Sequence, residues 1–332
     1  MKRNDSLIVC SRRAEQGGFA VVMVLSVIAI LALLMTSLMT RNGQLLQRSM
    51  GKIHQSQAQA YLLGTEAWAK QILVDDIAQS NHDDLTENWA YPVPFLPVEG
   101  GVISGQMVDL AGRFNVNNLR TEEQPDPVWV AIFSQLLEQA EASPALVWPL
   151  VDWLDSGVEA HEGGLEDAVY YGRPQPYRSS NQEMVNISEL GLVDGFDLPL
   201  VTKLTPWLSA VPGPTKINVN TSPRPVLEAL SAIWMQPTLK VDELLKNRPW
   251  ELMDDTPMAN DTGQDSTLTG PQVSLQGKMN RLNMGTYISL KSRYFSLDAR
   301  AQVGDQSTRL LATLARQPGK AQVLTRIWLP GD

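Results

Sequence analysis

The stretch from Phe19 to Thr40 constrains this 332-residue chain more than any other, because its 22 residues include no charged side chain. At a rise of ~1.5 Å per residue, a helix of that length crosses a hydrocarbon layer ~30 Å thick. A secretory signal peptide has a shorter apolar core of ~7 to 15 residues and a small-residue cleavage site, which "MTSLMTRNG" does not offer. The run therefore predicts a membrane-spanning helix.

The helix is expected to continue far beyond the apolar run. No proline precedes Pro92, and all 21 prolines lie between there and Pro330. Because proline interrupts helices, the first 91 residues can hold one very long helix, while the rest is divided into shorter elements. We expect one helix of roughly 60 residues. Apolar residues recur at helical spacing after Arg41, at Leu46, Met50, Ile53, Ala60, Leu63, Ala67 and Ile72.

The body of the chain is acidic. The formal net charge is −9, from 27 basic and 36 acidic side chains. The first 18 residues hold four basic and two acidic side chains, a net charge of +2, which leaves −11 for the remainder. Such a body repels nucleic acid and anionic lipid headgroups within the Debye length, so no nucleic-acid partner is expected. The single cysteine, Cys10, leaves the remainder without a disulfide.

Strand patterns lie on either side of a helical block. Residues 99–119 alternate in places and predict short strands joined by a turn at Ala111 and Gly112, and residues 292–330 predict further strands with a hairpin around Gly304 and Asp305. Between them, residues 120–250 indicate mostly short helices, which suggests an insertion into a strand-bearing frame.

Within this block, Asn186 or Ser188 is expected to cap one helix, and Ser222 to start another before Pro223. The segments "FNVNNL" and "INVNTSP" form a weak internal echo, which we interpret as two similar local turns.

The densest group of candidate ligands lies in "VDWLDSGVEAHEGGLEDAVYYG", residues 151–172. Calcium takes six to eight oxygen ligands from loops of this kind, but the spacing is not that of an EF-hand. From the residues alone, a solvated acidic loop and a calcium site both remain open. The histidines, His54, His82 and His161, are scattered, which argues against zinc. The candidate calcium ligands are Asp152, Asp155, Glu159, Glu162, Glu166 and Asp167.

The N-terminal residues resemble the signal of a type IV prepilin or a type II secretion pseudopilin, in which a short basic leader ends in Gly-Phe ahead of an intact apolar helix. The resemblance implies cleavage between Gly18 and Phe19 and methylation of the Phe19 amine, both by prepilin peptidase.

Most members carry a glutamate at the fifth mature position, which here is Met23. A carboxylate within the membrane needs a partner, and the family's glutamate meets a neighbouring subunit's amine. Met23 has no such requirement.

Further motifs follow in order along the chain: "DLAGRFNVNNL", "DWLDSG", "PYRSSN", "ISELGLVDGF", "INVNTSPRPVLEAL" and "LTRIW". Together with the leader, they resemble the minor pseudopilin K family of type II secretion. The resemblance implies an α+β pseudopilin fold, in which a long N-terminal helix packs on a small antiparallel sheet and a large α-helical domain is inserted. The implied segments are a leader (1–18), a transmembrane helix (19–40), the pseudopilin helix and first strands (41–119), the inserted domain (120–280) and the last strands (281–332).

The same resemblance implies a non-enzymatic subunit at the tip of the pseudopilus, which helps to start the filament and supports export across the outer membrane. It implies a single-pass protein of the bacterial inner membrane with its body in the periplasm. The implied partners are minor pseudopilins I and J, prepilin peptidase and the inner-membrane secretion platform. It also associates the acidic stretch with calcium, although Gly157 stands where relatives often have another acidic residue. Two alternatives remain, a minor pilin of a type IV pilus and a membrane-anchored periplasmic enzyme that uses the acidic loop.

Overall fold

The computed structural model describes residues 17–120, 124–156, 161, 167–233, 241–250 and 284–331. The chain divides into two compact units, Met1–Gln57 and Ala58–Asp332, and the boundary falls within helix α1 (Gly17–Gln79). By length and composition, one helix of the described residues, Phe19–Gln79, could cross a membrane. The predicted long helix is therefore confirmed.

The part of α1 that belongs to the second unit packs on a sheet. Ala58, Leu62, Ala69 and Leu73 are buried in one apolar cluster with residues of the sheet such as Leu297. Their spacings of four, seven and four residues keep them on one face of the helix. This face of α1 and the sheet share one hydrophobic core.

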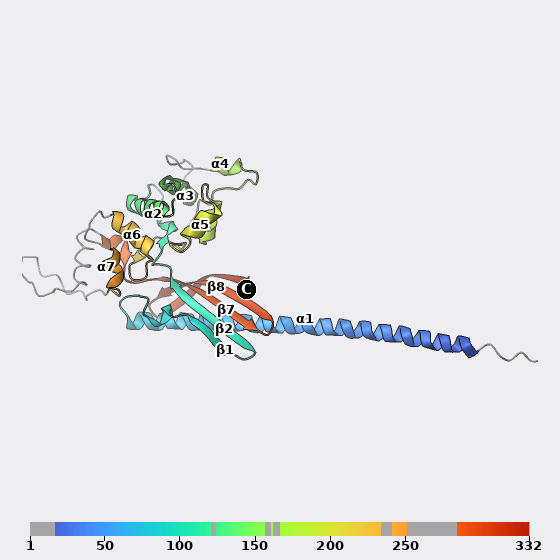
Figure 1. Ribbon diagram of the computed structural model, residues 1–332. Helices are drawn as coiled ribbons and strands as arrows, with labels where there is room; N and C mark the ends of the chain where they lie inside the picture. The colour runs from blue at the N-terminus through green and yellow to red at the C-terminus, as the bar shows by residue number, and fades with distance from the viewer. Residues whose placement is uncertain are drawn as a thin grey trace, which may run out of the picture. The chain divides into compact units, whose positions relative to one another are not determined.

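The sheet has five antiparallel strands in the order β1-β2-β7-β8-β9. Figure 1 shows β1, β2, β7 and β8 side by side. The predicted hairpin is confirmed, because Gly304, at a φ of 54°, and Asp305 join β7 to β8. The strands are β1 (Val93–Val98), β2 (Gly101–Asp109), β7 (Tyr294–Val303), β8 (Gln306–Gln317) and β9 (Lys320–Pro330).

Strands β2 and β7 are neighbours although much of the chain lies between them. They pair continuously from Gly101↔Val303 to Asp109↔Phe295, so residues 110–293 leave and re-enter the sheet at adjacent strand ends. The described helices of this part include α2 (Pro127–Gln139), α3 (Val147–Leu154), α5 (Leu198–Leu204) and α6 (Arg224–Ile233), drawn in green to orange in Figure 1.

The described elements between β2 and β7 are β3 (Phe114–Asn115), η2 (Val116–Leu119), α2 (Pro127–Gln139), η3 (Pro144–Leu146), α3 (Val147–Leu154), α4 (Asp167–Tyr171), η4 (Ile187–Leu192), α5 (Leu198–Leu204), β4 (Leu208–Ser209), β5 (Ile217–Asn218), α6 (Arg224–Ile233), α7 (Val241–Lys246), η5 (Met284–Thr286) and β6 (Ile288–Ser289).

Local capping explains several of these boundaries. Asn186 and Glu189 form a capping box at the start of η4, which confirms Asn186 as a cap, although the element is a 3-10 helix. The prediction for Ser222 was wrong, because α6 begins at Arg224 and the Ser222 hydroxyl donates to the Asn218 carbonyl at 2.6 Å.

The internal echo corresponds to two equivalent turns. Oδ1 of Asn115 accepts the N–H of Asn117 at 3.2 Å, and Oδ1 of Asn218 accepts the N–H of Asn220 at 3.0 Å. In both places the asparagine side chain imitates a backbone turn directly after a two-residue strand.

The second unit contains a separate apolar cluster for the region between β2 and β7. This cluster includes Phe114, Phe133, Leu150 and Leu227, all of which are fully buried. The apolar residues of α1 and of the five-stranded sheet form a different cluster. A long N-terminal helix, an antiparallel sheet and further helices confirm the α+β class. The one boundary between the two compact units lies between residues 57 and 58 and matches none of the limits of the five expected segments, so those limits stay a prediction.

Candidate metal centre

Helix α3 positions the first two carboxylates of the acidic segment. Asp152 lies in its last turn and Asp155 follows as the C-cap residue, a spacing that places both on one side of a helix. Asp152 is fully buried, and 6% of Asp155 is exposed. These two predicted ligands are therefore both buried at the end of α3.

His161 faces this pair. Its Nδ1 lies 2.5 Å from Oδ1 of Asp152 and 3.8 Å from Oδ2 of Asp155. The indole of Trp148 stacks on the imidazole, with 5.8 Å between ring centroids and 18° between ring planes. One ligand atom from each of the three titratable side chains lies within 4.8 Å of the others, so a single divalent cation can bridge them.

One oxygen of this group has no partner. Oδ2 of Asp152 is buried and accepts no hydrogen bond from the part of the chain that the structure describes. Buried polar atoms are nearly always paired, and an ionised carboxylate is costly to bury without compensation. A bound cation would supply that compensation, so the residues present fit a metal ion.

The other predicted ligands cannot be placed. Glu159, Glu162 and Glu166 lie outside the described residues, and Asp167 begins α4 with a side chain that is also outside them. The six-residue ligand set therefore stays a prediction. The sequence analysis does not include His161 among the candidate ligands, because the three histidines are scattered along the chain. Its position inside the acidic segment is the one sequence signal that points to its place beside Asp152 and Asp155.

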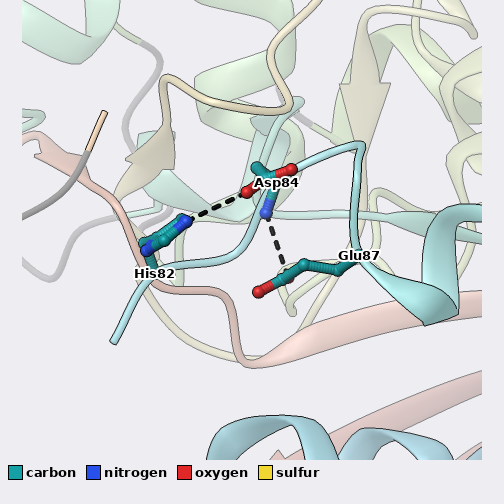
Figure 2. A group of neighbouring side chains, drawn as sticks. All are labelled: His82, Asp84 and Glu87. Atoms are coloured by element: carbon teal, nitrogen blue, oxygen red, sulfur yellow. Dashed lines mark hydrogen bonds and ion pairs between the residues drawn. The ribbon is translucent and has the colours of Figure 1, made fainter. Parts of the chain in front are cut away.

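A second group, His82, Asp84 and Glu87, has a similar composition but is already satisfied (Figure 2). Nε2 of His82 lies 3.0 Å from Oδ2 of Asp84, whose Oδ1 accepts the N–H of Thr86 at 2.5 Å. Oε2 of Glu87 accepts the N–H of Asp84 at 3.1 Å and Nε1 of Trp89 at 2.8 Å. These side chains hold the connection between α1 and η1 (Asn88–Ala90) in place.

A third acidic group surrounds Arg316 of β8. Nη1 of Arg316 lies 2.6 Å from Oδ2 of Asp76, and Nη2 lies 2.5 Å from both oxygens of Asp83. Asp76 is beyond the apolar run 19–40 and belongs to the second unit. Burial, followed by the charge of Glu87, raises the pKa of Asp76 to about 7 despite the guanidinium. This group ties the end of α1 to the sheet.

A buried network extends from Asp83 toward the inserted region. Nδ2 of Asn218 lies 3.0 Å from the carbonyl of Asp83 and 3.1 Å from Oδ2 of Asp109. The hydroxyls of Thr221 and Ser292 each donate to that same oxygen at 2.5 Å. Burial raises the pKa of Asp109, partly offset by these two hydroxyls. Polar contacts therefore join the end of β2 to the inserted region.

The residues predicted for processing and assembly lie in the first unit. Gly18 is the second residue of α1, and residues 1–16 of the predicted leader are outside the described residues. Phe19 is 71% exposed and Met23 is 54% exposed. An apolar side chain at position 23 is thus available for contact with lipid or another helix.

The family model and the similar proteins all have the same description, protein K of the type II secretion system. The sequence model of a family described as "Type II secretion system (T2SS), protein K" matches residues 112–213. "Type II secretion system protein K" of Pectobacterium carotovorum is 28% identical over 95% of this chain and 97% of the relative. The protein of the same description from Klebsiella pneumoniae is 32% identical over 62% of this chain and 67% of the relative.

Among solved structures, this chain is similar to a chain in the GspK-GspI-GspJ complex from the enterotoxigenic Escherichia coli type 2 secretion system. The TM-score is 0.69 at 23% identity, and the match covers 86% of this chain and 100% of that chain. This likeness supports the fold described above.

Proposed function

Because this chain belongs to the type II secretion system protein K family, we propose that it acts as a non-enzymatic minor pseudopilin at the tip of the pseudopilus. It helps to start the filament and so supports protein export across the outer membrane. The observation that carries this proposal is similarity to a type II secretion system protein K over 95% of this chain. The acidic body of the chain agrees with a role that involves no nucleic acid.

We propose that residues 19–40 anchor the protein in the bacterial inner membrane, with the body in the periplasm. Prepilin peptidase cuts between Gly18 and Phe19 and methylates the new amine, so the apolar helix is retained. Support comes from the length of the uncharged run and from the helix that begins at Gly17.

The proposed partners are minor pseudopilins I and J, together with the inner-membrane secretion platform. The solved structure with a similar fold is a GspK-GspI-GspJ complex, which is the reason to choose these partners. Met23 supports a tip position, since no carboxylate there requires an amine from a subunit above it.

Processing and partner binding test the proposal directly. The chain is produced with and without prepilin peptidase, and its N-terminus is read by mass spectrometry. We expect a methylated Phe19 only when the peptidase is present, and co-purification with I and J from membranes. The same N-terminus in both samples, or no association with I and J, would contradict the proposal. A Gly18→Glu variant provides the uncut control.

For the acidic segment, we propose a bound cation, for which calcium is the expectation from the family resemblance. Asp152 and Asp155 supply described carboxylates, and the unpartnered Oδ2 of Asp152 supports a positive ion there. Calcium at a hundred times its dissociation constant would add ~2.7 kcal/mol to the free energy of unfolding. A melting temperature that does not change with chelator would remove calcium from the proposal.

A further inference from the structure

One groove of the second unit is lined by basic side chains and by no acidic one. Its cavity volume is about 340 Å³, and its walls come from the turn after β2, the connection between β4 and β5, and the chain from β6 to β7. The charged residues of the lining are Lys216, Lys291 and Arg293, all of them exposed. The whole chain has a net charge of −9, so this groove is a positive patch on an acidic protein.

The three basic side chains have no carboxylate partner among the described residues. Nζ of Lys216 donates to the carbonyl of Gly285 at 2.5 Å, and the guanidinium of Arg293 lies over the ring of Tyr294, 5.3 Å from its centroid. Arginines of the sheet that do form ion pairs are Arg309, Arg316 and Arg326. The charge of the groove is therefore available to an anion from outside the chain.

Two carboxylates contact the backbone of the lining, but neither belongs to it. Both oxygens of Glu183 accept the N–H of Gly213 at 3.2 Å, and Oδ1 of Asp109 accepts the N–H of Ala111 at 2.8 Å. Asp109 is buried. These two acidic side chains hold the walls of the groove and do not occupy it.

The walls of the groove are fixed by contacts between distant parts of the chain. The hydroxyl of the buried Tyr294 donates to the carbonyl of Pro212 at 3.1 Å, and the carbonyl of Tyr294 accepts the N–H of Leu110 at 2.9 Å. Strands β5 and β6 pair beside them, with Ile217 opposite Ile288. Because the groove is already formed, binding there requires little ordering of the protein.

The lining favours carboxylates on a peptide over a compact phosphate. Phosphate sites are commonly built from unused backbone N–H groups at a helix N-terminus or a nest. Here the N–H groups of Ala111, Gly213 and Lys291 already donate to side-chain oxygens. The groove instead offers cations on separate segments, with the exposed Pro212 and Pro214 between them as apolar surface.

Size and charge limit what can enter. The volume lies at the lower end of the range for ligand pockets, ~300–1,000 Å³, so the groove accommodates a few side chains of a segment. An anionic membrane would bring the acidic remainder of the protein within the Debye length of its headgroups, which is unfavourable. A short acidic segment can enter the groove without that repulsion.

We propose that this groove is a docking site for an acidic segment of another protein, whose carboxylates contact Lys216, Lys291 and Arg293. Arg293 can bind a carboxylate through two parallel N–H groups, and the lysines add point charges. The inference goes beyond the proposed function, because it depends on neither the tip position nor the N-terminal processing.

The test measures binding of fluorescently labelled hexaglutamate to the purified full chain in a neutral detergent, by anisotropy. Hexaglutamine of the same length is the peptide control. We expect hexaglutamate alone to bind, and its affinity to fall as NaCl is raised above about 0.15 M. In every sample the basic residues of the leader are replaced by glutamine so that they do not bind the peptide, namely Lys2, Arg3, Arg12 and Arg13.

A double variant, Lys291→Gln with Arg293→Gln, should weaken hexaglutamate binding by about 10-fold, since two ion pairs are lost. Both side chains are exposed, so the far-ultraviolet circular dichroism should not change. Lys203→Gln with Lys320→Gln is the matched control, because it removes two exposed charges outside the groove. The control should change the affinity much less.

Three results would overturn the inference. Equal affinity of the wild type and the groove variant would show that the groove does not bind the peptide. An equal loss in both double variants would show that net charge alone decides. Groove-dependent binding of inorganic phosphate or of glycerophosphoglycerol, the soluble headgroup of phosphatidylglycerol, without binding of hexaglutamate would assign the groove to phosphate groups.

A last variant tests an occupant from the chain itself. Residues 254–265 include four aspartates, which are changed together to asparagine. We expect the affinity for hexaglutamate to stay as in the parent chain. Binding that occurs only in this variant would assign the groove to the chain's own acidic segment and overturn the inference. The role in secretion would be unaffected in each case, because N-terminal processing and association with I and J test it independently.

Discussion

Asp76 is a residue whose protonation depends on its packing. The folded protein raises its pKa to about 7, chiefly through burial, whereas an unfolded aspartate titrates near 3.9. Between these values the folded state holds more protons, so the free energy of unfolding falls as pH rises from about 4 to 7. Asp76→Asn should flatten this decline, as measured by denaturant unfolding across that range.

The neighbouring Asp75 is an exposed control on the same turn of α1. Asp75→Asn should leave the pH profile of the wild type unchanged. A profile of Asp76→Asn that coincides with the wild type would contradict this account of the Arg316 group.

Arg326, in the motif "LTRIW", forms a bidentate ion pair with Glu66 of α1. Its Nε and Nη2 lie 2.5 and 2.9 Å from the two oxygens of Glu66, which is 2% exposed, and its hydrogen bond lowers the pKa of Glu66. Arg326→Ala leaves that carboxylate with Lys70, 3.4 Å away, as its remaining ion-pair partner among the described residues. We expect a lower midpoint of denaturation, because removal of one partner leaves a buried charge poorly compensated.

Arg309→Ala gives a comparison for this change, since Arg309 forms an equally bidentate pair with the more exposed Asp298. Its effect on the midpoint should be smaller, as is usual for pairs near water. If both variants lose the same stability, burial of Glu66 is not the deciding factor.

At the scale of elements, the turn after β2 depends on close backbone approach. A Cβ atom on Gly112 would lie 2.4 Å from Oγ1 and 2.8 Å from the carbonyl carbon of Thr221. Thr221 cannot move away easily, because its hydroxyl is bonded to Asp109. Gly112→Ala should lower the free energy of unfolding by ~1–3 kcal/mol through overpacking, measured from denaturation curves.

Gly191 in η4 is a suitable control, because a Cβ there would meet no atom within 4 Å. Gly191→Ala should change stability by less than about 0.5 kcal/mol, the usual range for surface changes. An equal loss in both variants would indicate that the approach of Thr221 does not limit position 112.

Elements with a strong local signal could be predicted from the sequence, and others could not. The proline-free stretch gave α1, and Gly304 with Asp305 gave the β7–β8 hairpin. Strand β1 escaped prediction because it contains Pro94 and Pro97, which are tolerated at the edge of a sheet. Only part of the group of Asp152, Asp155 and His161 could be predicted. The two carboxylates are three residues apart at the end of α3, whereas His161 is brought to them by the path of the chain after α3 and not by a regular helical spacing.

At the scale of the whole molecule, Met23 offers a test of the proposed tip position. Met23→Glu introduces a carboxylate into the apolar run, where a charge is costly without a partner. We expect impaired assembly with I and J, or incorporation below the tip, detected by crosslinking and by the yield of secreted protein. Met23→Leu is the apolar control and should behave as the wild type. Normal assembly and secretion by Met23→Glu would show that position 23 has no part in tip placement.

The pairing of β2 with β7 has a consequence for the entropy of closing the long connection between them. Because Asp109 lies opposite Phe295, residues 110–293 form, in topological terms, the loop of a single hairpin. Closing a flexible loop roughly 45 times longer than a four-residue turn costs only about 3 kcal/mol more, and each doubling of length adds about 0.6 kcal/mol. Lineages could therefore lengthen or trim this region by many residues while the register of the sheet stays fixed, provided that its two ends return to neighbouring positions.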